Sequence, residues 1–598
     1  MQNTPARGKS SRIQLVATLL LVLALTGIFL VRAHLVDARA GAYTGCQGCF
    51  RLATLGQDAW LLGSLLLLLA LGCAAPWASL RLLARLAAAT LCVIAATDLA
   101  LFDLLSHRLL LDDVVRFGGD VGANASVLRA SLAAPSGVLK AIAAVLLLVT
   151  LIPACLPSPA RTRLGATFAV LAVGVFVFAL IASAQPVRYV HAAFTANVIA
   201  INLPRGRMKD YSEAHLHKQR ALAATLAQTC ERNPVAQSPN VIIVLAESLS
   251  SWQSRLLGSP LDWTPRLDAI ARDNHYFTRF HANGFTTSAG EIALFTGRVP
   301  FNPPGAIELN FDNYRVREGS LPEIARAAGH ESLFFTPGTT EFLGIGEWLR
   351  GLGFDHVHGS DDAYYAGMPR GQFSAVEDRQ FYERFLAWLD ARDSARAYVA
   401  TLLTVTSHPP FVDPRSDRID PEGTFRYVDE QIGRLHDALR ERGFFNDGVL
   451  IVMGDHRTMT PLRAEEYLEH GERAFARVPL VVAGAVDMPA VVDASFQQSD
   501  LVPSLAWMLG QPYCRTAFAG SFLRSDPQPP AWVIHVRGDD RNRVDVYHGA
   551  NAVSGYRLDG DASRWLDEPP PDADVVSAWI DEQRAEAALR RERRQAGR

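Results

Sequence analysis

The sequence predicts a multi-domain chain, in which a membrane-spanning helical domain precedes an α/β domain with a mostly parallel central sheet. Two observations predict this fold class. Long apolar runs fill the first third of the 598 residues, and after about residue 240 short apolar strands alternate with amphipathic helices. This length predicts roughly two to four domains. The formal net charge of -3 argues against nucleic acid as a partner.

We expect five membrane-spanning helices, because five stretches hold about the 20 apolar residues that a bilayer core requires. The third stretch is the weakest, since Asp98 and Asp103 lie near its end. The first is too long for a cleavable signal, and no convincing cleavage site precedes the next stretch. The expected spans are residues 13–33, 55–75, 86–105, 137–155 and 164–184.

Basic residues predict the orientation of these spans. They lie at the N-terminus, in the second loop and in the fourth loop, and positively charged loops stay in the cytoplasm. Five spans then place everything after about residue 185 outside the cytoplasm. The basic residues are Arg7, Lys9, Arg12, Arg81, Arg85, Arg161 and Arg163.

Four segments are expected along the chain. The connector after the spans is expected to contain a helix from Met208 to Cys230, and the charged C-terminal tail is expected to be a solvated helix. The segments are a transmembrane domain (residues 1–184), a helical connector at the membrane surface (185–235), an extracytoplasmic domain (236–566) and a C-terminal helical tail (567–598).

The cysteines leave two pairings open. Cys46 and Cys49 fall in a short external loop, where a local disulfide or two free thiols are expected, because a zinc ribbon needs a second pair. Cys230 and Cys514 would also lie outside the cytoplasm, where a disulfide can persist.

From Asn240 the pattern predicts alternating strands and helices, which is typical of a covered, mostly parallel sheet. A further pair of strands, Ala531–Val536 and Arg543–His548, is expected to complete an edge of the same domain. The other expected strands are Val241–Leu245, Ser332–Phe335, Tyr398–Val405, Val449–Met453 and Val478–Ala483, and the expected helices are Pro265–Arg272, Leu321–Ala328, Asp378–Asp390 and Tyr427–Arg442.

Metal-ligating side chains directly follow two of the expected strands. Asp455 and His456 come after one strand, and Glu247 comes after another. Sites in open α/β sheets gather beyond the carboxyl ends of the strands. Carboxylate oxygen and imidazole nitrogen suit zinc or manganese, and a buried acid requires a partner or a metal ion. The simpler interpretation is that Asp455 caps a helix beside a surface histidine.

Thr287 is the candidate nucleophile. A free hydroxyl attacks poorly, but coordination to a metal ion lowers its proton affinity and fixes its direction. Ser288 and the small residues after it would let backbone amides approach an anion. The alternative is that Thr286 and Thr287 cap the helix that starts near Ala289.

His408 and Arg457 are the candidate substrate-binding residues. His408 follows an expected strand, where it would hold a leaving oxygen or a phosphate through a hydrogen bond. Arg457 neighbours the ligands and would clamp an anionic headgroup. The alternatives are a loop histidine before Pro409 and an arginine in a surface salt bridge.

Together these motifs resemble the lipoteichoic-acid-synthase-like phosphoglycerol transferases of the alkaline phosphatase and sulfatase superfamily. The resemblance covers the membrane spans and roughly residues 240–515. No single motif is specific, but the combination is. The motifs are Glu247-Ser248, Thr287-Ser288-Ala-Gly-Glu291, Ser407-His408-Pro-Pro-Phe411, Gly454-Asp455-His456 and Asp500-Leu-Val-Pro-Ser-Leu.

The resemblance implies a sulfatase-like fold with one divalent metal ion, Mn²⁺ or Zn²⁺. It implies that Glu247, Thr287, Asp455 and His456 hold this ion, and that His408 binds the phosphate or headgroup. It also implies a covalent phosphoester on Thr287. Such a site is physically sensible, because phosphoryl transfer requires mainly positioning and charge neutralisation.

The sequence departs from the family where Gram-positive synthases contact glycerol phosphate. Those proteins have Trp and Arg upstream of a Leu-Gly-Phe-Asp tract, and here the positions hold Leu343 and Ile345. The donor headgroup is therefore open, or other residues such as Arg457 read it. The chain also lacks the Cys-rich nucleophile block of lipid A phosphoethanolamine transferases and the signature of formylglycine sulfatases.

The expected function is transfer of phosphoglycerol from a phospholipid, with phosphatidylglycerol favoured, to an extracytoplasmic glycan, with periplasmic glucan favoured. With the Ala/Leu/Arg-heavy composition, this indicates a multi-pass protein of a Gram-negative inner membrane whose catalytic domain faces the periplasm. Three alternatives stay open: a phosphoethanolamine transferase, a phosphodiesterase or sulfatase hydrolase of the same fold, and a non-catalytic membrane scaffold.

Overall fold

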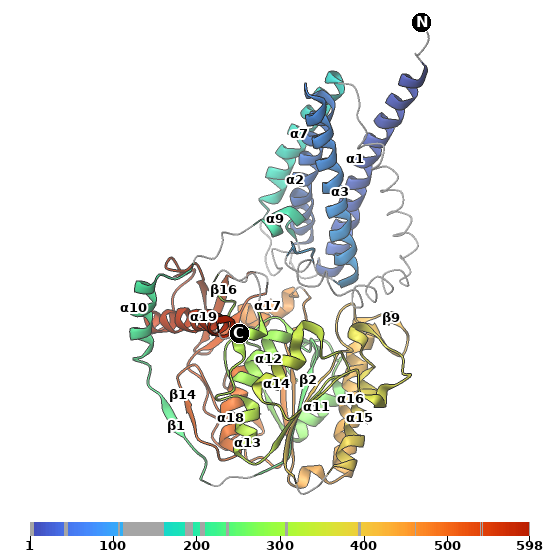
Figure 1. The fold of residues 1–598 in the computed structure, drawn as a ribbon. Coiled ribbons are helices and arrows are strands. Elements are labelled where there is room, and N and C mark those ends of the chain that lie inside the picture. Colours follow the sequence, from blue (N-terminus) through green and yellow to red (C-terminus); the bar gives the residue numbers. More distant parts are fainter. Residues whose placement is uncertain are drawn as a thin grey trace. The chain divides into compact units, whose positions relative to one another are not determined.

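The chain divides into two compact units, which are described separately (Figure 1). The first comprises Met1–Arg205 and Thr460–Glu469, and the second comprises Gly206–Met459 and His470–Arg598. The structure is a computed structural model that describes residues 5–40, 46–105, 108–111, 161–185, 195–203, 210–234, 238–304, 309–392, 396–460, 462–538, 540 and 542–596.

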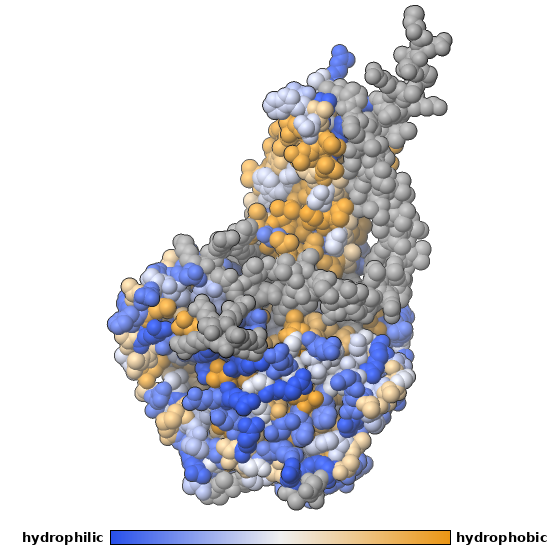
Figure 2. Space-filling view, in the orientation of Figure 1, coloured by the Kyte–Doolittle hydropathy of each residue, from blue (hydrophilic) through white to orange (hydrophobic). Residues whose placement is uncertain are grey.

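Four described helices of the first unit are long and apolar enough to cross a membrane. Their outward side chains are largely apolar, as Figure 2 shows, and Val170 is 73% exposed. Such a surface is suited to lipid. The count of five spans is not confirmed, because the expected span at 137–155 lies outside the described residues. The four helices are α1 (Pro5–Ala40), α2 (Gln47–Ala74), α3 (Ala78–Leu105) and α7 (Thr162–Ser183).

Helices α2 and α7 run antiparallel. The backbone N–H of Arg161, just before α7, donates to Cys73 in the last turn of α2. Trp60, in the middle of α2, donates to Ser183 at the end of α7. Helix α3 begins beside the last turn of α2, where Arg85 donates to a carbonyl. The starts of α3 and α7 therefore lie at the same end of the bundle, and α3 ends at the opposite end. This arrangement is the one expected if a further span connects α3 to α7.

The second unit is built on an eight-stranded sheet with the order β12-β3-β11-β10-β2-β7-β5-β6. Five of its pairings are parallel, and only the two pairings of β11 are antiparallel, so this described sheet is mixed but mostly parallel. The strands are β2 (Val241–Ala246), β3 (His275–Phe277), β5 (Glu331–Phe335), β6 (His356–His358), β7 (Tyr398–Leu403), β10 (Val449–Gly454), β11 (Leu480–Gly484) and β12 (Val491–Val492).

Helices cover both faces of this sheet, which explains why β2 is apolar at every position. Val241, Ile243 and Leu245 pack into one core, and the residues between them pack into the other. A strand buried on both faces reads as a continuous apolar run. The first core contains residues of α12 (Thr287–Thr296), α13 (Leu321–Ala327), α14 (Ile345–Leu352) and α18 (Leu501–Met508), and the second contains residues of α11 (Pro265–Asp273), α15 (Asp378–Ala391) and α16 (Pro421–Glu441).

Two expected helices have clearly different bounds in the structure, whereas the other strands and helices expected within residues 240–548 differ from their expected bounds by a few residues at most. Helix α16 begins at Pro421 rather than Tyr427, because Asp420 caps its first turn through the N–H of Gly423. The connector helix α10 (Glu213–Ala223) stops well before Cys230. Cys230 instead lies in β1 (Thr229–Glu231), which pairs with β14 (Tyr513–Arg515).

Both open cysteine pairings are disulfides in the structure. One joins Cys46 to Cys49, and the other joins Cys230 to Cys514 across the β1–β14 pair. The second bridge lies within the second unit and links β1 of the connector to β14, 284 residues later in the sequence.

The C-terminal strands form a sheet of their own. Strands β15 (Val533–Val536), β16 (Arg543–His548), β17 (Ala552–Arg557) and β18 (Arg564–Trp565) pair antiparallel in that order. The final helix, α19 (Ala573–Ala596), packs beside it with one face buried, so the expected fully solvated tail is wrong. Tyr211 of the connector donates to Asp581 of α19 at 2.8 Å, and Arg584 donates to the Asn302 carbonyl at 2.9 Å.

Candidate metal centre

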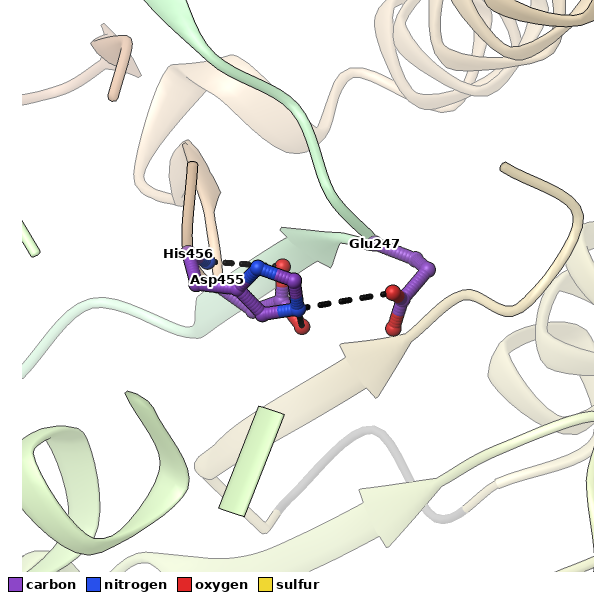
Figure 3. A group of neighbouring side chains, drawn as sticks. All are labelled: Glu247, Asp455 and His456. Atoms are coloured by element: carbon purple, nitrogen blue, oxygen red, sulfur yellow. Dashed lines mark hydrogen bonds and ion pairs between the residues drawn. The ribbon is translucent and has the colours of Figure 1, made fainter. Parts of the chain in front are cut away.

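The ends of two neighbouring parallel strands bring three potential ligands together. Strands β10 and β2 pair in register up to Gly454 and Ala246, so the residues that follow them meet at one edge of the sheet. Glu247 follows β2, and Asp455 and His456 follow β10. Their ligand atoms all lie within 4.8 Å of one another, and all three side chains are buried. Figure 3 shows the Glu247 carboxylate turned toward the imidazole of His456.

Hydrogen bonds to the turn after β2 hold the two carboxylates in place. Ser248 has a left-handed φ of 56°, and its backbone N–H donates to Asp455 Oδ1 at 2.8 Å. The Ser248 hydroxyl donates to Glu247 Oε1 at 2.8 Å. The loop after β7 supports the same turn, because Glu247 N–H donates to Thr404 Oγ1 and the Ser407 hydroxyl donates to the Glu247 carbonyl.

The backbone carbonyl of the next residue orients the ring of His456. Its Nδ1 lies 2.8 Å from the carbonyl of Arg457, a distance at which Nδ1–H donates. This leaves the Nε2 lone pair directed at the cluster, 3.5 Å from Glu247 Oε1 and 3.5 Å from Asp455 Oδ2. A histidine whose second nitrogen is fixed by a carbonyl is the usual arrangement of a metal ligand.

Thr287 also reaches this cluster. Its hydroxyl donates to Glu247 Oε2 at 3.1 Å and lies 3.4 Å from His456 Nε2. The capping of helix α12 is performed by Thr286, whose hydroxyl accepts from Ala289 N–H. Thr287 is the first residue of the helix, so its hydroxyl lies where the helix dipole favours an anion.

Helix α12 packs closely against the turn after β10. A Cβ on Gly290 would lie 2.3 Å from the Asp455 carbonyl oxygen, so glycine permits this approach. Access of backbone amides to an anion at these small residues stays a prediction. Gln498 fastens the same turn, since its side-chain amide donates to the carbonyls of Asp455 and Gly454 at 2.6 and 3.1 Å.

The electrostatics of the cluster favour a cation. Burial raises the pKa of Asp455, and the neighbouring Glu247 carboxylate raises it further, to about 7. Burial lowers the pKa of His456, but Asp455 and Glu247 outweigh this effect and raise it to about 9. Burial likewise raises the pKa of Glu247, yet the hydrogen bond and charge of His456 dominate and lower it to about 2. Two buried carboxylates thus compete for one positive charge.

The donor set fits a divalent metal ion. Asp455 Oδ2 is buried and accepts no hydrogen bond from any described residue. A buried carboxylate oxygen without a donor is costly unless a cation satisfies it. Two carboxylates, an imidazole nitrogen and a hydroxyl are ligands that suit zinc or manganese.

The structure corrects the simpler interpretation of the ligand pair. Asp455 Oδ1 accepts from Ser248 and from the His456 backbone, and the next described helix, α17, begins only at Ala464. His456 is fully buried. The interpretation as a helix cap beside a surface histidine is therefore wrong.

The predicted substrate-binding residues lie in different surroundings. His408 directly follows Ser407, whose hydroxyl donates to the Glu247 carbonyl, and its ring meets that of Phe373 edge-on with the ring centres 4.8 Å apart. Ser288 is buried on the same helix as Thr287. Arg457 is only 2% exposed and donates to the Thr458 carbonyl, so a surface salt bridge is wrong, while its headgroup role stays a prediction.

The sequence did not single out Thr404 and Gln498 as supports of the cluster, because each touches it only through tertiary contacts. Glu291 was noted as part of a motif but given no role. It is fully buried, and burial together with Asp455 and Glu247 raises its pKa well above the usual range. Leu343 and Ile345 pack against a hydrophobic core.

The chain is similar in sequence to several known proteins. The Sulfatase family profile matches residues 239–510. The chain is 23% identical to lipoteichoic acid synthase 2 of Bacillus subtilis, over 56% of this chain and 54% of that protein. It is 24% identical to phosphoglycerol transferase I of Escherichia coli, over 39% of this chain and 33% of that protein. The matches thus span about half or less of these relatives.

The chain also aligns with solved structures. The lipoteichoic acid synthase LtaP from Listeria monocytogenes aligns at a TM-score of 0.47 and 17% identity, over 63% of this chain and 97% of that one. The resemblance inferred from the motifs is confirmed by the family profile and the curated relatives.

Proposed function

Because residues 239–510 form a sulfatase-family domain, we propose that this chain is a membrane-anchored, metal-dependent phosphoglycerol transferase. The proposed donor is phosphatidylglycerol, and the proposed acceptor is an extracytoplasmic glycan, with periplasmic glucan favoured. The names of the two curated relatives support the type of reaction.

One observation carries the proposal. Thr286 caps helix α12, which leaves the Thr287 hydroxyl directed at Glu247 and His456. A hydroxyl held among potential metal ligands at a helix N-terminus is suited to attack phosphorus, because charge developing on the phosphoryl oxygens is stabilised there.

In the first step, Thr287 Oγ1 attacks the lipid phosphorus. An Oγ1–P bond forms, the bond from phosphorus to the diacylglycerol oxygen breaks, and diacylglycerol leaves with a proton. In the second step an acceptor hydroxyl attacks the phosphothreonine, and Thr287 regains its proton. A divalent ion held by Glu247, Asp455 and His456 would neutralise charge and lower the proton affinity of the Thr287 hydroxyl. His408 is the proposed proton carrier, because it directly follows the residue that donates to the Glu247 carbonyl.

The aromatic side chains near His408 support the proposal that the headgroup of the lipid donor binds there. Phe373 lies edge-on to His408, and Phe342 lies 4.9 Å from Phe373. Phe342 directly precedes, and Phe373 follows, the positions where Gram-positive synthases carry their headgroup contacts. We therefore propose that these rings, rather than Leu343 or Ile345, border the donor headgroup.

The membrane domain supports an extracytoplasmic site. Arg81, Arg85 and Arg161 all lie near the end of α2 and the starts of α3 and α7. This end of the bundle is the proposed cytoplasmic end. Two disulfides in the described chain are compatible with an oxidising compartment on the other side.

The test is intact-mass analysis of the full-length protein in lipid nanodiscs that contain either phosphatidylglycerol or phosphatidylethanolamine. We expect a phosphoglycerol adduct and release of diacylglycerol with the first lipid. Thr287→Ala should abolish both, because no hydroxyl remains at that position. Thr286→Ser is the matched control, since it keeps the cap and should keep the adduct.

The outcomes separate the candidates. An adduct formed only from phosphatidylethanolamine would identify a phosphoethanolamine transferase instead. Diacylglycerol release that persists in Thr287→Ala would refute the nucleophile. Free glycerol phosphate as the final product, in the presence of glucan, would indicate a hydrolase.

A further inference from the structure

A cavity lies at the edge strand of the main sheet, apart from the metal cluster. It has a volume of about 410 Å³, within the range of small-molecule sites. The lining strands β5 and β6 lie two and three strand positions from β2, which corresponds to about 10 and about 14 Å across the sheet at about 4.8 Å per strand. Its lining includes Glu331, His356, His358, Trp388, Arg392 and Arg396.

The strand register explains why these side chains meet. Leu333 pairs with His356 and Phe335 pairs with His358, so both histidines project from the same face of the sheet as Glu331. Helix α15 covers this face as far as Trp388, whose ring lies 5.5 Å from that of Phe335. The helix ends at Ala391, and the face beyond it is hollowed.

Arginine supplies the charge of this cavity. Arg396 forms an ion pair with Glu331, which leaves Arg392 as the excess cation among the lining residues. The Arg392 guanidinium lies over the rings of Tyr398 and Trp388, at 4.4 and 5.7 Å. Its Nη2 is buried and donates to no described residue. A guanidinium fixed by aromatic rings with spare donors is suited to a carboxylate or phosphate.

The other lining side chains suit a ligand that has hydroxyl groups as well as an anionic group. Glu331 would repel a small inorganic anion, but its carboxylate accepts hydrogen bonds from hydroxyl groups. His356 is exposed, His358 is half-buried, and both rings can donate or accept. Trp388 adds an apolar wall. A ligand that satisfies all of these groups carries one anionic group on a polyhydroxylated ring.

We propose that this cavity is a binding site for an anionic saccharide, whose acidic group is held by Arg392 and whose hydroxyls contact Glu331 and His356. The inference does not depend on the proposed transfer reaction, because binding here involves none of the residues of the metal cluster.

The test is calorimetric titration of the full-length protein in nanodiscs with glucose 6-phosphate, glucuronate, glucose and inorganic phosphate. We expect the two acidic sugars to bind, and glucose and phosphate to bind about tenfold or more weakly, since each lacks one half of the contacts. Arg392→Gln and His356→Ala should each weaken the acidic sugars, the first by about tenfold or more.

Two controls locate the binding. Arg434→Gln removes an exposed arginine of α16 that pairs with Glu430, and it should leave affinity unchanged. Thr287→Ala should also leave affinity unchanged, which distinguishes this site from the proposed catalytic centre. Unchanged affinity in Arg392→Gln, equal affinity for phosphate and acidic sugars, or no binding at all would overturn the proposal.

Discussion

Thr286 and Thr287 are adjacent and chemically alike, yet the fold gives them different contacts. The hydroxyl of Thr286 accepts from Ala289 N–H, and the hydroxyl of Thr287 donates to Glu247. The difference arises from backbone geometry, because Thr286 is extended (φ -135°) and precedes the helix that Thr287 begins. A cap residue needs that extended conformation. Thr287, the proposed nucleophile, is thus the threonine whose hydroxyl does not cap the helix.

Asp455 is the residue whose charge the proposed metal site most needs. Asp455→Asn keeps the shape but removes the negative charge beside the buried Oδ2. We expect about one divalent ion per wild-type chain and a loss of affinity in this variant that exceeds the roughly 10–100-fold cost of removing a group that only supports a ligand. Elemental mass spectrometry after dialysis against a fixed free metal concentration measures it.

Ser248→Ala is the matched variant for this experiment. It removes only the hydroxyl that donates to Glu247 Oε1, so its affinity loss should be smaller. Equal metal content in wild type, Asp455→Asn and Ser248→Ala would contradict the proposed ligand set.

Asp378 provides a pH test at a buried carboxyl outside the cluster. Thr406 donates to Oδ1 at 2.7 Å, whereas Oδ2 is buried without a donor from the described residues. Burial outweighs these hydrogen bonds and raises the pKa of Asp378 to about 6. A raised pKa means that the folded state binds the proton more tightly, so this stabilisation is complete below about pH 3.8 and is lost as the pH rises through about 6.

Asp378→Asn cannot ionise and should not show this loss. We expect wild type and variant to have similar stability near pH 4, and the variant to be more stable at pH 7 by on the order of 3 kcal/mol. Thermal unfolding midpoints of both proteins at each pH measure the difference. A constant difference between pH 4 and pH 7 would show that Asp378 does not titrate in this window.

At the scale of elements, charged side chains hold one end of the membrane bundle together. Arg108 donates to both oxygens of Asp98 at 2.8–3.2 Å and to the Ala196 carbonyl at 2.5 Å. Arg32 donates to the same carbonyl at 2.6 Å and pairs with Asp58 at 3.4 Å. These contacts fasten α1, α2 and α3 to the segment around α9 (Val198–Asn202). Buried charges in such surroundings are stable only when paired.

This pairing predicts a difference between single and double substitutions. Arg108→Gln removes the arginine that pairs with Asp98 and should destabilise the protein by about 3–5 kcal/mol. Arg108→Gln combined with Asp98→Asn removes both charges and should recover part of that loss. Thermal unfolding in detergent compares the two, and a double variant no more stable than the single one would argue against a buried ion pair.

At the scale of the whole molecule, the number of spans decides on which side the sulfatase-family domain lies. Four candidate spans are described, and the opposite positions of the end of α3 and the start of α7 favour a fifth. An odd number, together with the arginines near the start of α3, predicts that the domain lies outside the cytoplasm.

Reporter fusions test this orientation. Alkaline phosphatase fused after residue 598 should be active, since it folds with disulfides outside the cytoplasm, whereas green fluorescent protein at the same point should be dark. Fusions after Pro76, between α2 and α3, are the matched control and should give the opposite pattern. Identical signals from the two positions would contradict an odd number of spans after Pro76.

Much of the site could be predicted from the sequence because its signals are local. A continuous apolar run such as Val241–Ala246 identifies a doubly covered strand, and an acid directly after it lies at the strand end wherever the strand packs. The supports Thr404 and Gln498 could not be predicted this way. Each contacts the cluster across 40 or more residues of sequence, as the 43 residues between Gln498 and Asp455 illustrate.

The local pattern of apolar residues and strand-end acids predicted the four described candidate spans, the class of the second domain and the position of Glu247, Asp455 and His456 at strand ends, while the ligand set with Thr287 came from the family resemblance and stays a prediction. Tertiary structure alone decided that β2 and β10 are neighbours, that Thr286 takes the cap, that the C-terminal strands form a separate sheet, and that α19 buries one face. Periodicity is a property of a few consecutive residues, whereas pairing and burial depend on segments that are distant in the chain and meet only when it folds.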